Sequence, residues 1–347
     1  MSAPGVAGED GLLPEETALW AVRMLLGREP AGPAELLRLR ALPTLDALRQ
    51  ALAETAEFDA LADRRAGRGP RYAVPPVMLR PPVNEGLPWR FAPPTLEHPV
   101  SQLCTSAQFA EPAFHEIAEA MALDRVAHRG IWEPVYIVSV LATEGMVAPG
   151  KRAIGFGCGR ERIPAVLASR GVTVLASDLA GPEPAERLDG LFDPRVIHRE
   201  DFDRLVSFYP IDANDLPAGI EGQFDCLWSA SLLQQAGSIR RAQDFVERAM
   251  AALRPGGIAV HTMEFNLTSN EDTPDGGGVS VLRRRDVEAL ASRLQAQGHE
   301  VLPLNLHPGH DPEDEAIDLP PYGLPHLKLF VGRHVATSFG LAVRAKG

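Results

Sequence analysis

A glycine-rich loop carries the strongest chemical signal in this sequence. Gly155, Gly157 and Gly159 directly follow a short apolar stretch that is typical of a strand, and a helical pattern begins soon after them. Glycines at such a turn let the backbone bend sharply and approach a ligand closely, with the amides of the following helix directed at it. Asp178 lies about twenty residues further on, at the end of the second predicted strand, where a carboxylate can accept hydrogen bonds from ribose hydroxyls. We therefore predict a nucleoside-binding crevice that begins at Gly155, with a tight turn that binds nothing as the alternative.

The spacing of these glycines discriminates between nucleotide cofactors. A dinucleotide fingerprint, G-x-G-x-x-G, needs glycine at position 160, where this chain has Arg160. The form G-x-G-x-G resembles that of the class I S-adenosylmethionine (SAM)-dependent methyltransferases. A pyrophosphate needs the third glycine and a bare helix terminus, whereas SAM carries no phosphate. The resemblance implies SAM as cofactor, and an NAD-dependent oxidoreductase is the alternative that the missing glycine argues against.

The resemblance covers roughly residues 125–347. Residues 211–217 end the third predicted strand, like the acidic segment that holds the adenine in that family. The resemblance implies that Asp212, rather than the neighbouring Asp215, accepts the adenine amino proton, and that the end of the fourth strand, near Ser229, faces the methionine part of SAM. The full set of cofactor-binding residues that we predict is Gly155, Phe156, Gly157, Gly159, Asp178, Leu179, Asp212, Ala213, Asn214 and Ser229.

The fifth predicted strand delivers candidates for the catalytic residues. Methyl transfer from a sulfonium is an in-line displacement, and an oxygen nucleophile benefits from a base. Ligands of open α/β sheets bind beyond the carboxyl ends of the strands, where residues 260–266 arrive. Histidine titrates near neutral pH, so we predict His261 as the base, with Glu264 as a second catalytic residue, and a packed strand histidine as the alternative. Strand alternation places His261 and Met263 on one side and Thr262 and Glu264 on the other.

The segment His128-Arg-Gly-Ile-Trp-Glu133 joins an aromatic residue to charged ones. It resembles the HRK-x-WE element of a bacterial methyltransferase subfamily that is often encountered with polysaccharide genes. Residues 262–270, 320–328 and 337–340 resemble further segments of that subfamily. The resemblance implies O-methylation of a sugar or glycan intermediate, while Trp132 alternatively anchors a helix to the core. The acceptor-binding residues that we predict are Arg129, Trp132, Glu133 and Asn266.

Two departures from the subfamily bear on catalysis. Gly130 replaces a lysine, and Gln234-Gln235 stand where the subfamily usually has Glu-His. Glutamine cannot take a proton at neutral pH, so three interpretations stay open: this position was never the base, the acceptor differs, or transfer activity is lost. In the last case the alternative function is a non-catalytic scaffold in a glycan-modifying assembly, whose other proteins would be its partners.

An acidic loop contains His307, His310, Asp311 and Asp314. Oxygen-rich sites of this kind suit Mg²⁺. A solvated loop is the default interpretation, so we predict no metal.

The elements that must position these residues follow from the apolar pattern. Helical spacing over 12–65, a proline-rich stretch and renewed helical spacing precede strand-helix alternation from Lys151. We predict a helical N-terminal domain (1–65), a linker or strap (66–100), a helical cap (101–150) and a core (151–347). The N-terminal part resembles a small domain with an LLGREP-type signature that is attached to bacterial glycan-modifying enzymes. The core is predicted to be a Rossmann-like, doubly wound α/β sheet of seven strands with an antiparallel edge strand.

The predicted elements of the cap and core are defined by their apolar runs. The strands that we predict are 153–157, 172–177, 206–211, 224–228, 257–264, 300–304, 327–331 and 337–343. The helices are 109–123, 132–141, 163–170, 239–253 and 286–297, and Pro255-Gly256-Gly257 is predicted to be a turn before the fifth strand.

Composition excludes several classes of protein. The net charge is −12 and there is no basic block, which argues against a nucleic-acid binder. No apolar run approaches the length of a membrane span, and the first residues do not have the pattern of a signal peptide. The three cysteines are far apart and lack metal-site spacing. We therefore expect a soluble cytoplasmic protein that acts on a small-molecule or glycan acceptor.

Overall fold

The structure is a computed structural model that describes residues 12–26, 28–59, 70–179, 184–276, 278–320, 322–323 and 325–347. The predicted boundary between residues 65 and 66 lies outside the described residues, as does Gly27 of the N-terminal signature. The chain divides into two units, one formed by Met1–Arg71 with Ala316–His326 and the other by Tyr72–Glu315 with Leu327–Gly347. The predicted cap and most of the predicted strap and core thus share the second unit.

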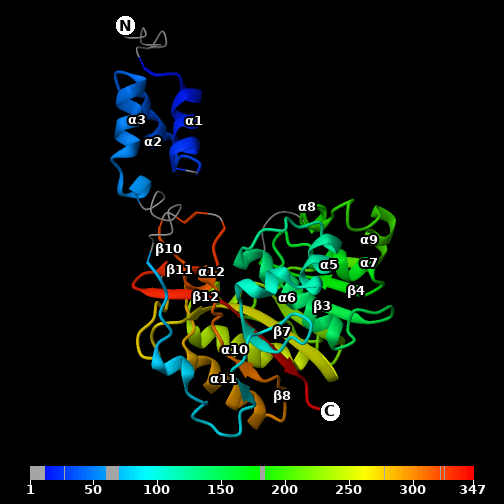
Figure 1. The fold of residues 1–347 in the computed structure, drawn as a ribbon. Helices are drawn as coiled ribbons and strands as arrows, with labels where there is room; N and C mark the ends of the chain where they lie inside the picture. The colour runs from blue at the N-terminus through cyan, green and yellow to red at the C-terminus, as the bar shows by residue number, and fades with distance from the viewer. Residues whose placement is uncertain are drawn as a thin grey trace. The chain divides into compact units, whose positions relative to one another are not determined.

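Three helices of the first unit surround a small apolar cluster of their own (blue in Figure 1). They are α1 (Glu15–Leu26), α2 (Pro33–Arg40) and α3 (Leu45–Ala53). Proline is favourable in the first turn of α2, and the hydroxyl of Thr44 caps α3 by accepting a hydrogen bond from the Ala47 amide at 3.1 Å. Over the described residues of this unit the predicted helical spacing is confirmed. The cluster is formed by Leu13, Ala18, Val22, Leu26, Leu39, Leu48 and Leu52.

A mixed sheet forms the centre of the second unit. Its strand order is β1-β9-β2-β12-β7-β6-β3-β4-β5, and β3 to β7 are parallel. The bounds are β1 (Trp89–Arg90), β2 (Ser101–Leu103), β3 (Arg152–Phe156), β4 (Thr173–Ala176), β5 (Val206–Phe208), β6 (Phe224–Ser229), β7 (Leu253–Asn266), β8 (Glu300–Val301), β9 (Leu304–Asn305), β11 (Lys328–Val331) and β12 (His334–Arg344).

The antiparallel strand β12 lies inside the sheet, not at its edge as predicted. One side of β12 pairs with β7 over residues 336–344, and the other side pairs in turn with β11, β2 and β8. The sheet also has more strands than the predicted seven. The predicted strand 300–304 is split at Pro303, which has no N–H to donate, and the proline-rich segment contributes β1, which pairs with β9.

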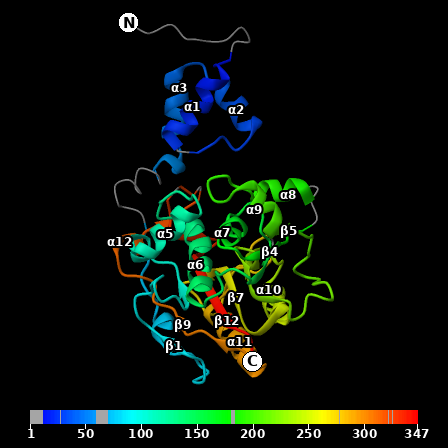
Figure 2. The ribbon, with the colours of Figure 1, turned by 90° about the vertical axis from the view of Figure 1, so that its right-hand side faces the viewer.

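Helices cover both faces of this sheet, with α5, α6 and α7 on one face and α10 and α11 on the other (Figure 1, Figure 2). The predicted helix 109–123 is divided, because a short 3-10 helix (Ser106–Ala110) ends before Pro112 starts α5. The described helices of the unit are α5 (Pro112–Ala120), α6 (Arg129–Thr143), α7 (Ile163–Ser169), α8 (Pro184–Leu191), α9 (Arg199–Leu205), α10 (Ile239–Ala249), α11 (Arg284–Ala296) and α12 (Pro312–Glu315). Among the described residues, every helix is too short or too polar to cross a membrane.

The predicted turn at Pro255-Gly256-Gly257 is an irregularity within β7. Phe224 of β6 pairs with Leu253, but Cys226 pairs with Ile258, so β7 holds extra residues between these two points. Gly256 has φ +76°, a left-handed conformation that favours glycine. The strand therefore begins before the bulge and ends at Asn266, on the same edge as the glycine loop.

Candidate functional site

The glycine loop follows β3, and its three glycines meet different demands. A Cβ atom on Gly155 would lie 2.3 Å from Cζ2 of Trp228, so this position is glycine because the indole ring occupies the space. Gly157 and Gly159 have φ values of +68° and +52°. A Cβ on Gly159 would meet no atom within 4 Å. The loop therefore faces open space at Gly159, which leaves room for a ligand there.

Asp178 follows β4 and binds the glycine loop directly. Its Oδ2 accepts hydrogen bonds from the Gly159 amide at 3.1 Å and from Nη1 of Arg187 at 3.0 Å. Its Oδ1 accepts one from the amide of Leu179, a residue whose own surface is 55% exposed. The predicted acid and glycine loop are thus brought together. Arg187 was not among the predicted residues, and any ribose hydroxyl would have to share the Asp178 carboxylate with it.

The segment after β5 lies beside Asp178. The Ile211 amide donates to the backbone oxygen of Asp178 at 3.0 Å, and the exposed Asp212 accepts from the Asn214 amide at 2.8 Å. Arg248 of α10 donates to the backbone oxygens of Ala213 and Asn214. Asp212 and Asn214 line an open hollow of about 660 Å³, together with Arg240, Arg241, Asp244, Glu247 and Arg248.

His261 lies on the face of β7 that α10 covers. Its Nδ1 is 2.8 Å from the hydroxyl oxygen of Ser229, and its ring contacts the edge of Phe245, with a centroid distance of 5.9 Å. The residue is fully buried, and burial lowers its pKa to about 3. A histidine in this environment stays neutral at pH 7 and is a very weak base. The geometry thus matches the alternative interpretation, a histidine packed within the strand. Its surroundings are unfavourable for His261 as the catalytic base.

The opposite face of β7 carries a buried polar cluster. Glu133 of α6 accepts hydrogen bonds from the hydroxyls of Ser231 at 2.5 Å, Thr262 at 2.7 Å and Ser338 at 2.5 Å. Beside it, Nη1 of Arg129 pairs with Oε2 of Glu264 at 2.7 Å. We call these six side chains the Glu133 cluster. They join α6, β7, β12 and the loop after β6, and Thr262 and Glu264 lie on the same side of β7 as predicted.

The cluster includes residues that the sequence analysis did not select. Ser338 lies in a segment that resembles the subfamily, which was the available signal. Ser231 has φ +51°, a strained conformation for a residue other than glycine, and its amide donates to the Thr262 hydroxyl at 3.1 Å. The predicted departure at Gln234-Gln235 lies next to it, and Gln235 donates to the Ser231 backbone oxygen at 3.3 Å. Gln235 therefore lies beside the Glu133 cluster.

Two predicted acceptor-binding residues are used inside the chain. Trp132 is fully buried and stacks on Tyr136, with 4.7 Å between ring centroids, which corresponds to the anchoring alternative. Asn266 donates to the backbone oxygen of Asp272 and the Thr273 hydroxyl, and its side-chain oxygen accepts from the amides of Thr268 and of Ser269. These bonds fasten the loop after β7 and leave the Asn266 amide group little capacity for an acceptor.

Glu161 is a further ionisable group at the glycine loop, and the sequence analysis did not select it. The indole N–H of Trp228 donates to its Oε1 at 2.6 Å. Burial, together with smaller effects from the negative charges of Glu133 and Asp178, raises the pKa of Glu161 to about 8. Glu133 and Asp178 therefore lie near enough to Glu161 for their charges to act on it. The signal in the sequence that could have identified Glu161 was its position as a charged residue two places after Gly159.

The acidic loop is held by internal partners. Ser106 donates from its hydroxyl to Asp311 and from its amide to Asp314, at 2.9 and 2.8 Å. The buried ammonium of Lys328 lies 3.7 Å from Asp314 and donates to the backbone oxygen of Pro308. Within the part of the chain that the structure describes, no three His, Cys, Asp or Glu side chains are grouped closely enough to hold a metal.

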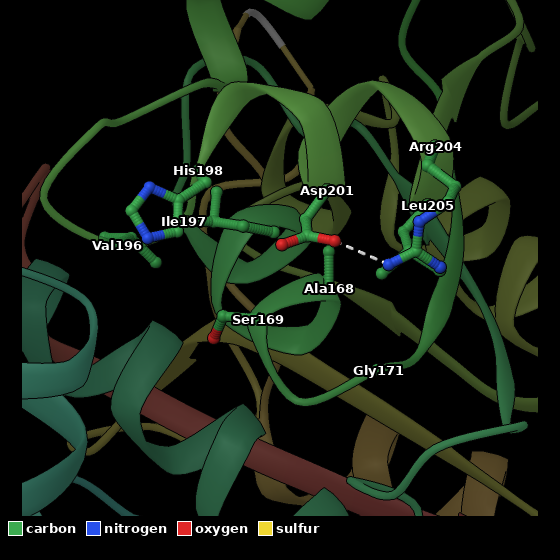
Figure 3. Close-up of a pocket in the computed structure, with 9 residues that line it drawn as sticks. All are labelled: Ala168, Ser169, Gly171, Val196, Ile197, His198, Asp201, Arg204 and Leu205. Carbon is green, nitrogen blue, oxygen red and sulfur yellow. Dashed lines mark hydrogen bonds and ion pairs between the residues drawn. The ribbon is translucent and has the colours of Figure 1, made fainter.

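Another hollow lies away from the site, at α7 and α9 (Figure 3). It has a volume of about 290 Å³ and contains the Asp201–Arg204 ion pair at 2.6 Å. Both helices end just before β4 and β5 begin, so this hollow lies at the amino ends of the strands. The glycine loop lies at the carboxyl ends. The lining residues are Ala168, Ser169, Gly171, Val196, Ile197, His198, Asp201, Arg204 and Leu205.

No protein-family model and no curated protein sequence matches this chain. Several solved structures are similar over part of their length. The [4+2]-cyclase SpnF is 21% identical, with 48% of this chain and 58% of the cyclase covered at a TM-score of 0.37. A SAM-dependent methyltransferase from Aquifex aeolicus is 14% identical, with 61% and 89% covered at a TM-score of 0.35. Magnesium protoporphyrin IX methyltransferase from Synechocystis PCC 6803, solved with bound SAH, is 13% identical, with 61% and 82% covered at a TM-score of 0.38.

Proposed function

We propose that the second unit is a SAM-dependent methyltransferase. One observation carries the proposal: the glycine loop, Asp178 and Asp212 meet beyond the carboxyl ends of three adjacent parallel strands, β3, β4 and β5. Open α/β sheets bind their ligands at this edge. Arg160 at the position of a third fingerprint glycine favours a nucleoside ligand without a diphosphate.

The residues at this edge suit SAM. Asp178 would hold the ribose hydroxyls, Asp212 with the Ala213 backbone the adenine, and the loop around Gly159 the methionine part. Glu133 and Asp178 place negative charge near Glu161, and Glu161 can itself ionise when a cation binds beside it, which favours a ligand with a positively charged sulfur. When bound, SAM supplies a methyl group that a nucleophile can displace.

The acceptor that we propose is a hydroxyl of a sugar or glycan intermediate. Two segments that resemble the polysaccharide-associated subfamily, 128–133 and 337–340, lie far apart in the sequence. They meet in the Glu133 cluster, where Nη1 of Arg129 donates to the Ser338 hydroxyl at 3.2 Å. The Glu133 cluster would fix the shape of the acceptor-binding side. Glu264 is the remaining candidate for accepting the proton of the acceptor hydroxyl, because the pKa of His261 is too low for a base at neutral pH.

A non-catalytic scaffold in a glycan-modifying assembly is the second candidate. The pairing of Arg187 with Asp178 and the low pKa of the buried His261 favour it. We also propose a cytoplasmic location, which the three free, buried cysteines support because such thiols persist in reducing compartments.

Calorimetry with SAM, S-adenosylhomocysteine (SAH) and NAD separates these functions. We expect SAM and SAH to bind and NAD not to bind. Transfer of labelled methyl from SAM to a panel of sugars and glycan intermediates would then establish the enzyme. Binding without transfer to any acceptor would favour the scaffold, and binding of NAD alone would overturn the proposal in favour of an oxidoreductase.

A further inference from the structure

Glu161 is held at the glycine loop by a specific arrangement of neighbours. The missing side chain of Gly155 leaves the space that the Trp228 indole fills, 2.3 Å from where a Cβ would lie. That ring delivers its N–H to Oε1 of Glu161 at 2.6 Å. Cys158 lies in the same corner, and its burial raises the pKa of its thiol, so it stays neutral. Glu161 thus accepts hydrogen bonds from the Trp228 indole and from the Cys158 thiol. A carboxyl group has about four acceptor positions, so Glu161 keeps capacity for a charged ligand.

The charges around Glu161 come from elements on several sides. Glu133 of α6 and Asp178 after β4 are negative, and both disfavour ionisation of Glu161. Each has a cation beside it: Arg129 lies 3.9 Å from Glu133, and Arg187 lies 3.0 Å from Asp178. Among the described residues, no cation lies within ion-pair distance of Glu161, so its charge is the least balanced of the three carboxyl groups.

We propose that Glu161 is the residue that distinguishes the positively charged methyl donor from its product, whose sulfur is neutral. This inference rests on the proposed function of the same site. An ionised Glu161 is stabilised by a sulfonium and gains much less from SAH. The same residue would therefore favour binding of SAM and release of SAH after each turnover.

Ionisation of Glu161 should couple SAM binding to the release of a proton. The pKa of Glu161 is about 8 in the ligand-free protein, so the group is mostly protonated at pH 7. A bound cation lowers that pKa, and SAM binding must then release a proton. SAM affinity should increase by up to about tenfold for each pH unit from 6 to 8 and level off above 8, because the free group is then already ionised.

Calorimetry of the full chain tests this directly. SAM and SAH are titrated at pH 7 in phosphate and in Tris, whose ionisation enthalpies differ, so that the released protons can be counted. We expect close to one proton for SAM and much less for SAH. Glu161→Gln should abolish the release, and at pH 8 it should weaken SAM binding by more than about tenfold while changing SAH affinity less than about twofold.

One further variant tests the role of the Trp228 hydrogen bond, and another serves as a control. Trp228→Phe removes the donor that stabilises the ionised carboxyl, so the pH midpoint of SAM binding should move upward. Glu116→Gln removes one exposed negative charge on α5 and should leave the ratio of SAM to SAH affinity unchanged. The wild-type proton count stands even where a variant fails to fold.

The outcomes separate this inference from the proposed function. If SAM and SAH bind, but without differential proton release and with an unchanged affinity ratio in Glu161→Gln, the role of Glu161 is overturned and the methyltransferase proposal stands. If neither compound binds the wild-type protein, the proposed function itself fails.

Discussion

The two faces of β7 place adjacent residues in opposite surroundings. His261, under α10, has one polar contact, to Ser229, and burial makes its charged form unfavourable. Thr262, under α6, belongs to a cluster in which one carboxylate accepts three hydroxyl donors. His261, the predicted base, lies on the apolar face, whereas the hydrogen-bonded polar side chains lie on the other face. Which helix covers each face decides what a side chain can do.

The largest expected effect comes from removing the anion of the polar face. Glu133→Ala leaves the buried hydroxyls of Thr262 and Ser338 and the part-buried hydroxyl of Ser231 without their acceptor. It also leaves Arg129 beside fewer negative charges. We expect the free energy of unfolding to fall by about 3–5 kcal/mol, measured by urea denaturation. The exposed Glu116→Ala on α5 is the control and should change it by less than about 0.5 kcal/mol. A loss below about 1 kcal/mol for Glu133→Ala would show that the cluster is not a buried unit.

The burial of His261 on the apolar face should make the free energy of unfolding depend on pH. The pKa of His261 is about 3 in the folded protein and near 6.5 when unfolded, so the unfolded chain binds the extra proton between these values. Its contribution to stability is present above pH 6.5 and is lost as the pH falls toward 3. Between pH 6.5 and 4.5 the wild type should lose about 2 kcal/mol more unfolding free energy than His261→Gln. Equal losses would mean that His261 is accessible to protons in the folded state.

A matched pair of substitutions compares the faces directly. Thr262→Val removes a donor to Glu133 and the acceptor of the Ser231 amide, and we expect it to cost about 1–3 kcal/mol. Met263→Leu, one residue further and on the opposite face, conserves volume and should cost less than about 1.5 kcal/mol. Chemical denaturation of both variants checks this. A larger cost for Met263→Leu than for Thr262→Val would reverse the comparison.

The smallest effect is expected on the solvent side of α10. Arg240 and Asp244 form an exposed pair at 2.9 Å, four residues apart. Exposed pairs contribute little because solvent screens them. Arg240→Ala should leave the urea midpoint unchanged. A clear shift would indicate that the exposed side of α10, and not only its buried side, helps to hold this helix over His261.

The sequence predicted those features that depend on local pattern. The glycine loop, the parallel strands from β3 to β7 and the alternation of His261 and Thr262 follow from spacing within short segments. The Glu133 cluster does not, because its hydroxyls come from Ser231, Thr262 and Ser338, roughly 100 to 200 residues from Glu133. The demand for glycine at position 155 likewise comes from Trp228, a contact across two strands. Strand β1 was missed because prolines hide a two-residue strand whose partner is β9.

The interior position of β12 has a consequence for synthesis of the chain. Strands β3 to β7 emerge from the ribosome well before residues 334–344, and until then Ile258–Asn266 lacks its antiparallel partner. An unpaired strand edge is a template for association with other chains. Nascent chains that carry β7 without β12 are therefore expected to depend on chaperones and to aggregate when translation stalls between the two strands.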